Sequence, residues 1–279
     1  MGDFTDKAAK IAECAERLRI EACEPGFLKR LLTKTASVWA LITRIPLPRG
    51  VLPRGFALPD SDAVATMPLA GALFGLVCAL PARIAAMAIA PPAAAWIGCG
   101  IYTILGWSLH LDGWGDLWDG VGSGLQGERM RKVMKDSGVG AFGVAGIALA
   151  ISTRAALLSG LDAGSWMSAC AIGGGVGRFA LAVTAYAGKY PWDDGMGRDI
   201  VRGFEGYQLF CSFAAACVLF PLAPLGWTVG MFASGISGAA CAMWGAKNLG
   251  GANGDVLGAS AVLGELLALM ACSLYATPV

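Results

Sequence analysis

Charge is scarce in this sequence of 279 residues: only 15% are Asp, Glu, Lys or Arg, and there is a single histidine. An average soluble domain is about 25% charged, whereas this chain is 56% hydrophobic and has a mean hydropathy of +0.61. Its nine cysteines include no CxxC pair and fall mostly in apolar segments, so they are expected to be reduced packing residues. The composition therefore excludes an ordinary soluble domain and indicates an integral membrane protein.

Several common motifs are also absent. There is no GxxxxGK[ST] loop, and no GxGxxG follows a strand, so neither of the usual glycine-rich nucleotide folds is expected. No cleavable signal peptide is expected, because the first 30 residues are charged and lack an apolar central stretch. Nothing in the sequence indicates a nucleic-acid partner.

Long apolar segments dominate the rest of the chain. A helix needs about 20 residues to cross a bilayer, and seven segments are close to that length. They predict an all-α fold, a polytopic membrane helix bundle in which the fifth span is the shortest because it ends at Pro221. The predicted spans are residues 64–88, 92–111, 140–160, 165–187, 207–222, 228–246 and 256–276.

The chain before the first span divides in two. Residues 1–35 are predicted to be a cytoplasmic amphipathic extension, and residues 36–279 the membrane-embedded catalytic domain. Residues 38–48 are too short to cross and contain Arg44 and two prolines. We expect them to form a helix at the membrane interface that stops at Pro46.

Basic residues mark one side of the predicted bundle. Eighteen of the 21 Lys and Arg lie before Ala63 or in the predicted loops 111–139, 188–206 and 247–255. Because Lys and Arg collect in cytoplasmic loops, the N-terminus and every motif-bearing loop are predicted to be cytoplasmic, with the C-terminus outside.

Three ionisable residues lie deep within predicted spans. Arg178 and Glu265 are at similar depth, where a lone charge costs about 2.5–3.5 kcal/mol or more. We therefore expect them to pair or to face a wet cavity, and a structural ion pair is supported as well as a substrate contact. Arg154 lies deeper still, and the sequence does not identify its partner.

The most informative motif runs from His110 to Gly120, HLDGWGDLWDG. On a helix, Asp112, Asp116 and Asp119 share one face, and such carboxylates repel one another unless a cation lies between them. A hard divalent cation such as Mg²⁺, which prefers oxygen ligands, fits this pattern. A solvated acidic turn is the alternative, although the position at the end of a hydrophobic span favours function. His110 either serves a substrate or a proton, or simply caps the span.

Further polar motifs occur in the other predicted cytoplasmic segments. Carboxylates that face basic side chains and glycine-exposed amides suit a phosphate ester bound through a metal, because phosphoryl transfer depends on positioning and charge neutralisation. Membrane topology alone explains part of the basic cluster equally well, since Lys and Arg collect inside whatever the protein does. The charged and amide candidates in these motifs are Arg44, Arg129, Arg131, Lys132, Lys135, Asp136, Asn253 and Asp255.

Taken together, ITRIPLP, MPLAG, LHLDGWGDLWDG, MKDSGVGAFG and GGANGDVLGA resemble the motifs of the cobalamin (5′-phosphate) synthase family, the adenosylcobinamide-GDP ribazoletransferases, over about residues 36–268. The resemblance implies a Mg²⁺-dependent phosphotransferase of the bacterial inner membrane. Such enzymes join α-ribazole, or its 5′-phosphate, to adenosylcobinamide-GDP and release GMP. Asn253 stands where the family pattern is expected to have Thr, and Val262 where an acidic residue is expected.

The motifs and the resemblance together predict the site residues. They are Asp112, Asp116 and Asp119 as metal ligands; Asp116, Asp119, Asp136 and His110 as catalytic residues; and Arg44, Arg129, Lys135, Asp255 and Asn253 as substrate-binding residues. Which aspartate takes the proton of the attacking hydroxyl is left open.

Two other functions compete with this prediction. CDP-alcohol phosphatidyltransferases also use an Asp-rich helix, but their DG-x-x-AR pattern is missing after Asp112 and Gly113. A transporter is the second alternative, although transporters place ionisable residues near the midplane, often in repeated halves. Small residues at a spacing of four, such as Gly71 and Gly75, are expected to let helices approach closely. The oligomeric state is open, and glycine-rich helix faces would suit a homo-oligomer.

Overall fold

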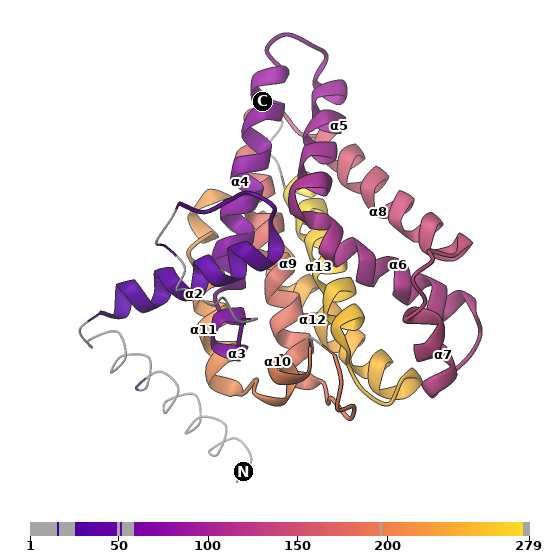
Figure 1. Ribbon diagram of the computed structural model, residues 1–279. Coiled ribbons are helices and arrows are strands. Elements are labelled where there is room, and N and C mark those ends of the chain that lie inside the picture. Colours follow the sequence, from indigo (N-terminus) through magenta and orange to yellow (C-terminus); the bar gives the residue numbers. More distant parts are fainter. Residues whose placement is uncertain (1–15, 17–25, 49–50, 52–58, 196, 276–279) are drawn as a thin grey trace.

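The structure, a computed structural model, describes residues 16, 26–48, 51, 59–195 and 197–275 (Figure 1). Most of the predicted N-terminal extension lies outside these residues. Within them, every regular element is a helix, which confirms the predicted all-α membrane bundle. The helices are α2 (Phe27–Ile42), α3 (Ser61–Val64), α4 (Met67–Ala85), α5 (Pro91–Tyr102), a π-helix (Thr103–Trp107), α6 (Ser108–Gly122), α7 (Gly127–Met134), α8 (Ala141–Ser159), α9 (Trp166–Ala187), α10 (Arg198–Arg202), α11 (Gly206–Cys217), a 3₁₀ turn (Phe220–Leu222), α12 (Pro224–Asn248) and α13 (Gly254–Leu274).

Six helical segments of the described chain are long and apolar enough to cross a membrane, one fewer than predicted. The exception is the predicted span at 207–222, where α11 has only 12 residues. Such a helix rises about 18 Å, against about 30 Å of hydrocarbon. A 3₁₀ turn that contains Pro221 follows it, and Leu219 packs on Gly175 about midway along α9. The chain turns back after Leu222 into α12, whose Gly226 packs on Cys272 near the end of α13, so this apolar segment is shorter than the six candidate spans.

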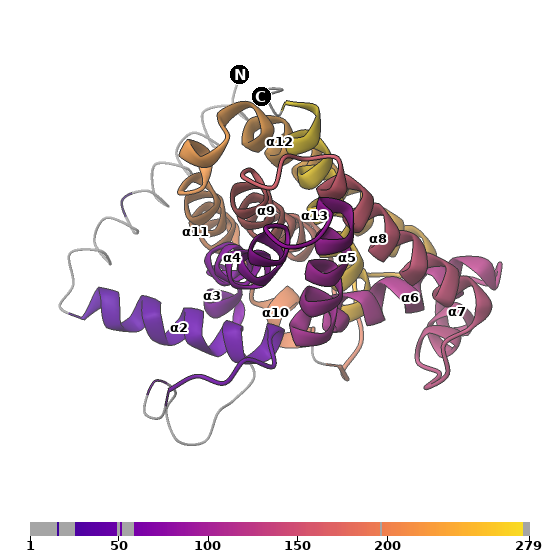
Figure 2. The ribbon, with the colours of Figure 1, turned by 90° about the horizontal axis from the view of Figure 1, so that it is seen from above.

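Helix α9 forms the centre of the bundle, with α4, α11, α12 and α13 around it (Figure 2). Glycine makes this packing possible. A Cβ on Gly71 or Gly75 of α4 would collide with the α9 backbone at Gly174 or Cys170, which confirms the predicted close approach at small residues. Outward-facing apolar side chains complete the pattern expected in lipid: Phe232 on α12 is 71% exposed.

A buried ion cluster ties four helices together. Arg178 of α9 donates to Glu265 of α13 at 2.5 Å, which confirms the predicted pairing, and Arg154 of α8 bonds to the other oxygen of Glu265. Tyr102 of α5 donates to Glu265 at 2.9 Å, and the Arg154 guanidinium lies 3.8 Å from the Tyr102 ring centroid. All four side chains are buried, so the cluster is structural and closed to solvent.

The acidic motif lies on a helix that is longer than predicted. Helix α5 continues through the π-helix at Thr103–Trp107 into α6, so one helical segment runs from Pro91 to Gly122. The π-helix marks a bend, after which α6 runs away from the axis of α5 (Figure 1). The predicted loop 111–139 therefore begins too early, and the aspartates are held on rigid helix.

Helix α2 also differs from the prediction. It covers Phe27–Ile42, so it runs through the predicted domain boundary at residue 35 and ends before Pro46. The amide of Arg44 donates to the carbonyl of Leu105 at 2.6 Å, which draws the chain out of the helix and onto the π-helix.

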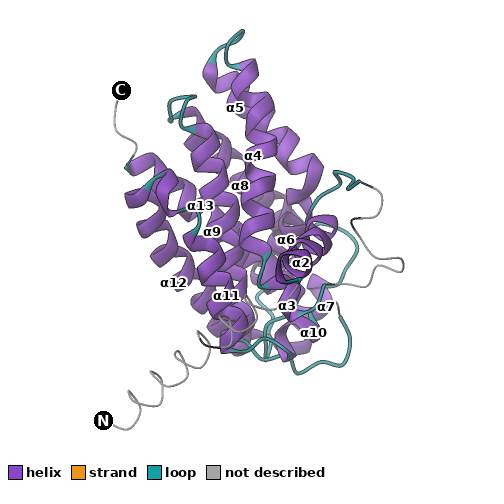
Figure 3. Cartoon of the chain, turned by 90° about the vertical axis from the view of Figure 1, so that its left-hand side faces the viewer, coloured by secondary structure: helices purple, strands orange, loops and turns teal. Residues whose placement is uncertain are grey.

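Polar loops gather at one end of the bundle. Figures 1 and 3 place α3, α7 and α10 together at the end opposite the α4–α5 turn. The turn between α12 and α13 lies at the same end (Figure 1). The four motif-bearing segments thus share one face, as the basic residues predicted.

Candidate active site

A cavity of about 400 Å³, here called the larger cavity, lies where α6 and α13 meet the segment after α7. Four carboxylates and two cations line it, so its charge is negative and it attracts cations. The charged lining residues are Asp112, Asp116, Asp136, Asp255, Arg131 and Lys135.

Glycines bring two of these carboxylates together. A Cβ on Gly113 of α6 would lie 2.8 Å from the Cα of Asp255, and a Cβ on Gly258 of α13 would lie 3.3 Å from the carbonyl oxygen of His110. Because neither residue has a side chain, α6 and α13 cross in close contact. Asp112 and Asp255, distant in sequence, therefore border the same cavity.

The N-terminus of α13 opens into the larger cavity. Asn253 caps it: its side-chain oxygen accepts from the Val256 amide at 3.1 Å, and its amide group donates to Asp255 at 2.7 Å. Asn serves as well as Thr at such a cap, so this departure from the family pattern preserves the structure. The exposed helix end also contributes partial positive charge.

Asp119 has a different environment from the other two aspartates of its motif. It is not among the residues that line the larger cavity, and its two oxygens accept from the amides of Gly140 at 2.7 Å and Gly143 at 2.8 Å. These amides belong to the N-terminus of α8, where a carboxylate is favourable. The observed role of Asp119 is to join α6 to α8, and its predicted roles in metal binding and catalysis stay predictions.

The glycines of the motif GVGAFG make room for that carboxylate. A Cβ on Gly143 would collide with Asp119, whereas a Cβ on Gly138 has no atom within 4 Å. We predict that Gly143→Ala lowers the free energy of unfolding by about 0.5–2 kcal/mol, the value of a lost helix cap. Thermal unfolding in detergent will measure this, with Gly138→Ala as the matched control. Equal stability of the two variants would contradict the capping role.

The basic wall of the larger cavity is held by an acidic partner. Arg131 and Lys135 each contact Asp194 at 2.5 Å, and Arg131 also lies 4.6 Å from the Trp192 ring centroid. Hydrogen bonds from Lys135 and then Arg131 lower the pKa of Asp194 to about 2. The sequence analysis counted Arg131 among the charged candidates but left it and Asp194 out of the predicted site residues, although Arg131 and Lys135 are four residues apart and share a helix face.

Two predicted substrate-binding residues do not reach this cavity. Arg44 is exposed after the end of α2, and Arg129 is exposed on α7. Lys135, Asn253, Asp255 and the predicted catalytic residue Asp136 do line it.

A second, smaller cavity of about 130 Å³ adjoins the first. The two cavities share Asp112, Gly254 and Asp255. His110 lines the smaller cavity and is only 4% exposed, with its Nδ1 3.5 Å from Arg178. Most of the remaining wall is aliphatic, formed by Leu41, Met67, Leu109, Leu181, Ile200 and Leu257.

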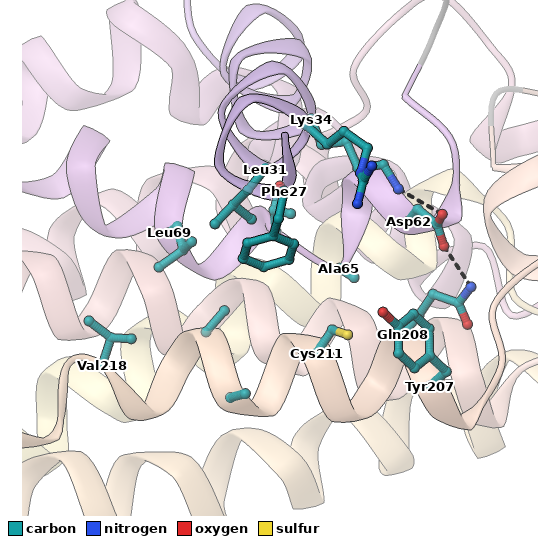
Figure 4. Close-up of a pocket in the computed structure, with 14 residues that line it drawn as sticks. Phe27, Leu31, Lys34, Asp62, Ala65, Leu69, Tyr207, Gln208, Cys211 and Val218 are labelled. Atoms are coloured by element: carbon teal, nitrogen blue, oxygen red, sulfur yellow. Dashed lines mark hydrogen bonds and ion pairs between the residues drawn. The ribbon is translucent and has the colours of Figure 1, made fainter. Parts of the chain in front are cut away.

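A third pocket, of about 290 Å³, lies between α2, α4 and α11 (Figure 4). Its polar end is closed by Asp62, which accepts from Lys34 at 2.7 Å and from Gln208 at 2.8 Å. It shares no lining residue with the two other cavities. We assign it no part in the chemistry.

Comparison with known proteins identifies the family. Residues 34–273 match the cobalamin-5-phosphate synthase family. The chain belongs to this family. An adenosylcobinamide-GDP ribazoletransferase of Syntrophobacter fumaroxidans is 32% identical over 248 residues, which cover 86% of this chain and 96% of that protein. Proteins of the same name from Shigella flexneri and Escherichia coli K12 are 30% and 29% identical, each over 84% of this chain and 97% of theirs. No solved structure matches.

The donor set of this cobalamin-5-phosphate synthase homologue suits a hard cation. Its larger cavity offers carboxylate oxygens, yet no group of three or more His, Cys, Asp or Glu side chains in the described chain is arranged to hold a metal ion. Mg²⁺ normally keeps several waters and is bound through one or two carboxylates plus substrate phosphates. The residues therefore fit Mg²⁺ that arrives with a phosphorylated substrate.

Proposed function

We propose that this protein, a transferase of cobalamin biosynthesis, moves the adenosylcobinamide phosphoryl group from adenosylcobinamide-GDP to α-ribazole or its 5′-phosphate and releases GMP. Membership of the cobalamin-5-phosphate synthase family and relatives named for this reaction support the proposal. The observation that carries it is the larger cavity, which gathers carboxylates, two cations and a helix N-terminus at the polar end of a membrane bundle.

Asp112 and Asp116 would hold Mg²⁺ in this cavity, and the ion would neutralise charge on the diphosphate of the donor. Asp119 would serve the site indirectly, since it fixes α8 against α6. Arg131 and Lys135 would exchange Asp194 for phosphate oxygens, which a guanidinium binds in bidentate fashion.

The reaction forms one P–O bond and breaks another. A ribose hydroxyl oxygen attacks the phosphorus that bears the cobinamide arm, and the bond to the oxygen of GMP breaks. The hydroxyl proton goes to a carboxylate, for which Asp255 is better placed than Asp136 because it borders both cavities. Asn253 holds one oxygen of Asp255, which orients the carboxylate.

The transporter alternative receives less support. A transport path would need the deep ionisable residues Arg178 and Glu265 to face water, but these residues belong to a closed cluster with Arg154 and Tyr102. The relatives are bacterial, so we place the protein in the bacterial inner membrane. The basic residues would orient its active-site end toward the cytoplasm.

The direct test is GMP release by the purified protein in detergent or proteoliposomes, given adenosylcobinamide-GDP and α-ribazole. Release with Mg²⁺, and loss of it with EDTA, is the outcome that we expect. Absence of GMP with both substrates and Mg²⁺ present would reject the proposal. Release that persists in EDTA would reject only the role of the metal.

Helix α7 offers a matched pair of variants. We predict that Arg131→Gln raises the KM for adenosylcobinamide-GDP by about 10–100-fold, because a hydrogen bond to a charged group contributes about 1.5–3 kcal/mol. Arg129→Gln, on the exposed side of the same helix, should leave this KM unchanged. Steady-state kinetics will decide, and equal effects of the two substitutions would remove Arg131 from the binding site.

A further inference from the structure

We infer that the smaller cavity binds the base of the acceptor nucleoside, so that its walls select the lower base. The inference rests on the proposed function, because α-ribazole is a nucleoside of dimethylbenzimidazole. It assigns a separate place to each substrate: the diphosphate in the larger cavity and the flat apolar base in the smaller one.

The size and lining of the smaller cavity suit an aromatic ring. Its volume of about 130 Å³ is close to the roughly 150 Å³ of an apolar cavity that holds benzene. The aliphatic wall from α2, α4, α6, α9, α10 and α13 would therefore enclose the dimethyl-substituted six-membered ring. The imidazole ring and ribose would extend toward the larger cavity.

The shared wall sets the direction of the nucleoside. Asp112, Gly254 and Asp255 border both cavities. A base in the smaller cavity therefore places its ribose at the junction, beside carboxylates that can orient a hydroxyl. This is where the attacking oxygen must be if the donor diphosphate lies in the larger cavity.

His110 provides a polar group for the base. A guanidinium has no acceptor, so Nδ1 of His110 must accept from Arg178, which it faces at 3.5 Å. In a neutral ring the hydrogen is then on Nε2. Among the described residues no hydrogen bond to Nε2 is found, and His110 is a buried residue, 4% exposed, in the wall of the smaller cavity. The unsubstituted ring nitrogen of benzimidazole could accept a hydrogen bond from this N–H group of His110.

Filling the smaller cavity tests the inference. Ile200 of α10 is half-buried and lines it, whereas Ile236 of α12 is 70% exposed on the lipid side. Ile200→Trp should raise the KM for α-ribazole at least tenfold and leave the KM for adenosylcobinamide-GDP within twofold. Ile236→Trp should change neither.

A smaller acceptor makes the test specific for the base. One methylene in an apolar pocket changes specificity by about 10–200-fold, so the riboside of unsubstituted benzimidazole should lose less activity than α-ribazole in Ile200→Trp. An equal loss with both ribosides would overturn the inference. Absence of GMP release with either riboside in the unsubstituted protein would instead reject the proposed function.

The role of His110 has its own readout. We expect the wild-type protein to prefer the benzimidazole riboside over an indole riboside, which lacks the acceptor nitrogen. His110→Phe should remove that preference in kcat/KM while retaining the shape of the ring. A preference that persists in folded His110→Phe protein would overturn the assignment of the hydrogen bond.

Discussion

Replacing Asp116 by asparagine will lower GMP release by about 10²–10³-fold, the usual cost of losing one electrostatic contact in a transition state, and will raise thermal stability. Both effects have one cause. Burial, and then repulsion from the carboxylates of Asp255, Asp112 and Asp119, disfavour a negative charge on Asp116, and the protein needs that charge only when Mg²⁺ and diphosphate are bound. Removing the charge relieves the repulsion and weakens the site.

Asp119→Asn is the matched control on the same helix. Its carboxylate accepts from the amides of Gly140 and Gly143, and the amide group of Asn offers only one acceptor oxygen for the two donors. We therefore expect this variant to lose thermal stability, where Asp116→Asn gains it. Unfolding curves and GMP release, measured on the same preparations, will separate the two residues. Normal turnover by Asp116→Asn would contradict the site proposed here.

The acidic helix illustrates what sequence can and cannot predict. Spacings of four and three correctly placed Asp112, Asp116 and Asp119 on one helix, because periodicity is a local property. The separation of Asp119 from the others depends on α8, which approaches from a later part of the chain. No local pattern contains that information.

The basic wall is a second example. Positive charge in loops predicted that the motif-bearing segments lie at one end of the bundle, since topology governs where Lys and Arg collect. It could not distinguish Arg131 from Arg129, because that choice depends on Asp194, which approaches from a distant loop. Asp255 was selected from its polar motif and from the family resemblance. Its position follows from the close crossing of α6 and α13 at Gly113.

Length estimates failed where tertiary contacts override composition. The segment at 207–222 is as apolar as the true spans, yet α11 has only 12 residues and turns back beside α9. Likewise, the length of the apolar segment predicted that the second span ends at residue 111, whereas the helix continues to Gly122. Packing against α8 and α13 supports α6 beyond its apolar part.

Loss of the buried anion should have the largest effect on folding. Glu265 is the acidic partner of both Arg154 and Arg178, and all three are buried. Glu265→Gln keeps the shape but leaves two cations uncompensated. Breaking a buried pair in this way costs about 3–5 kcal/mol, so we expect a large fall in the midpoint of thermal unfolding and in the yield of folded protein.

Two further variants, which change the number of uncompensated charges in the cluster, serve as controls for this prediction. The cluster carries two positive charges and one negative charge, so Arg154→Met leaves a neutral pair of Arg178 and Glu265 and should cost much less than Glu265→Gln. The double variant, Arg154→Met with Glu265→Gln, leaves one buried cation instead of two and should be more stable than Glu265→Gln alone. If Glu265→Gln unfolds at the temperature of the unsubstituted protein, the anion does not hold the helices together. Because Arg178 also faces His110, a loosened cluster should disturb the smaller cavity and raise the KM for α-ribazole in whatever protein remains folded.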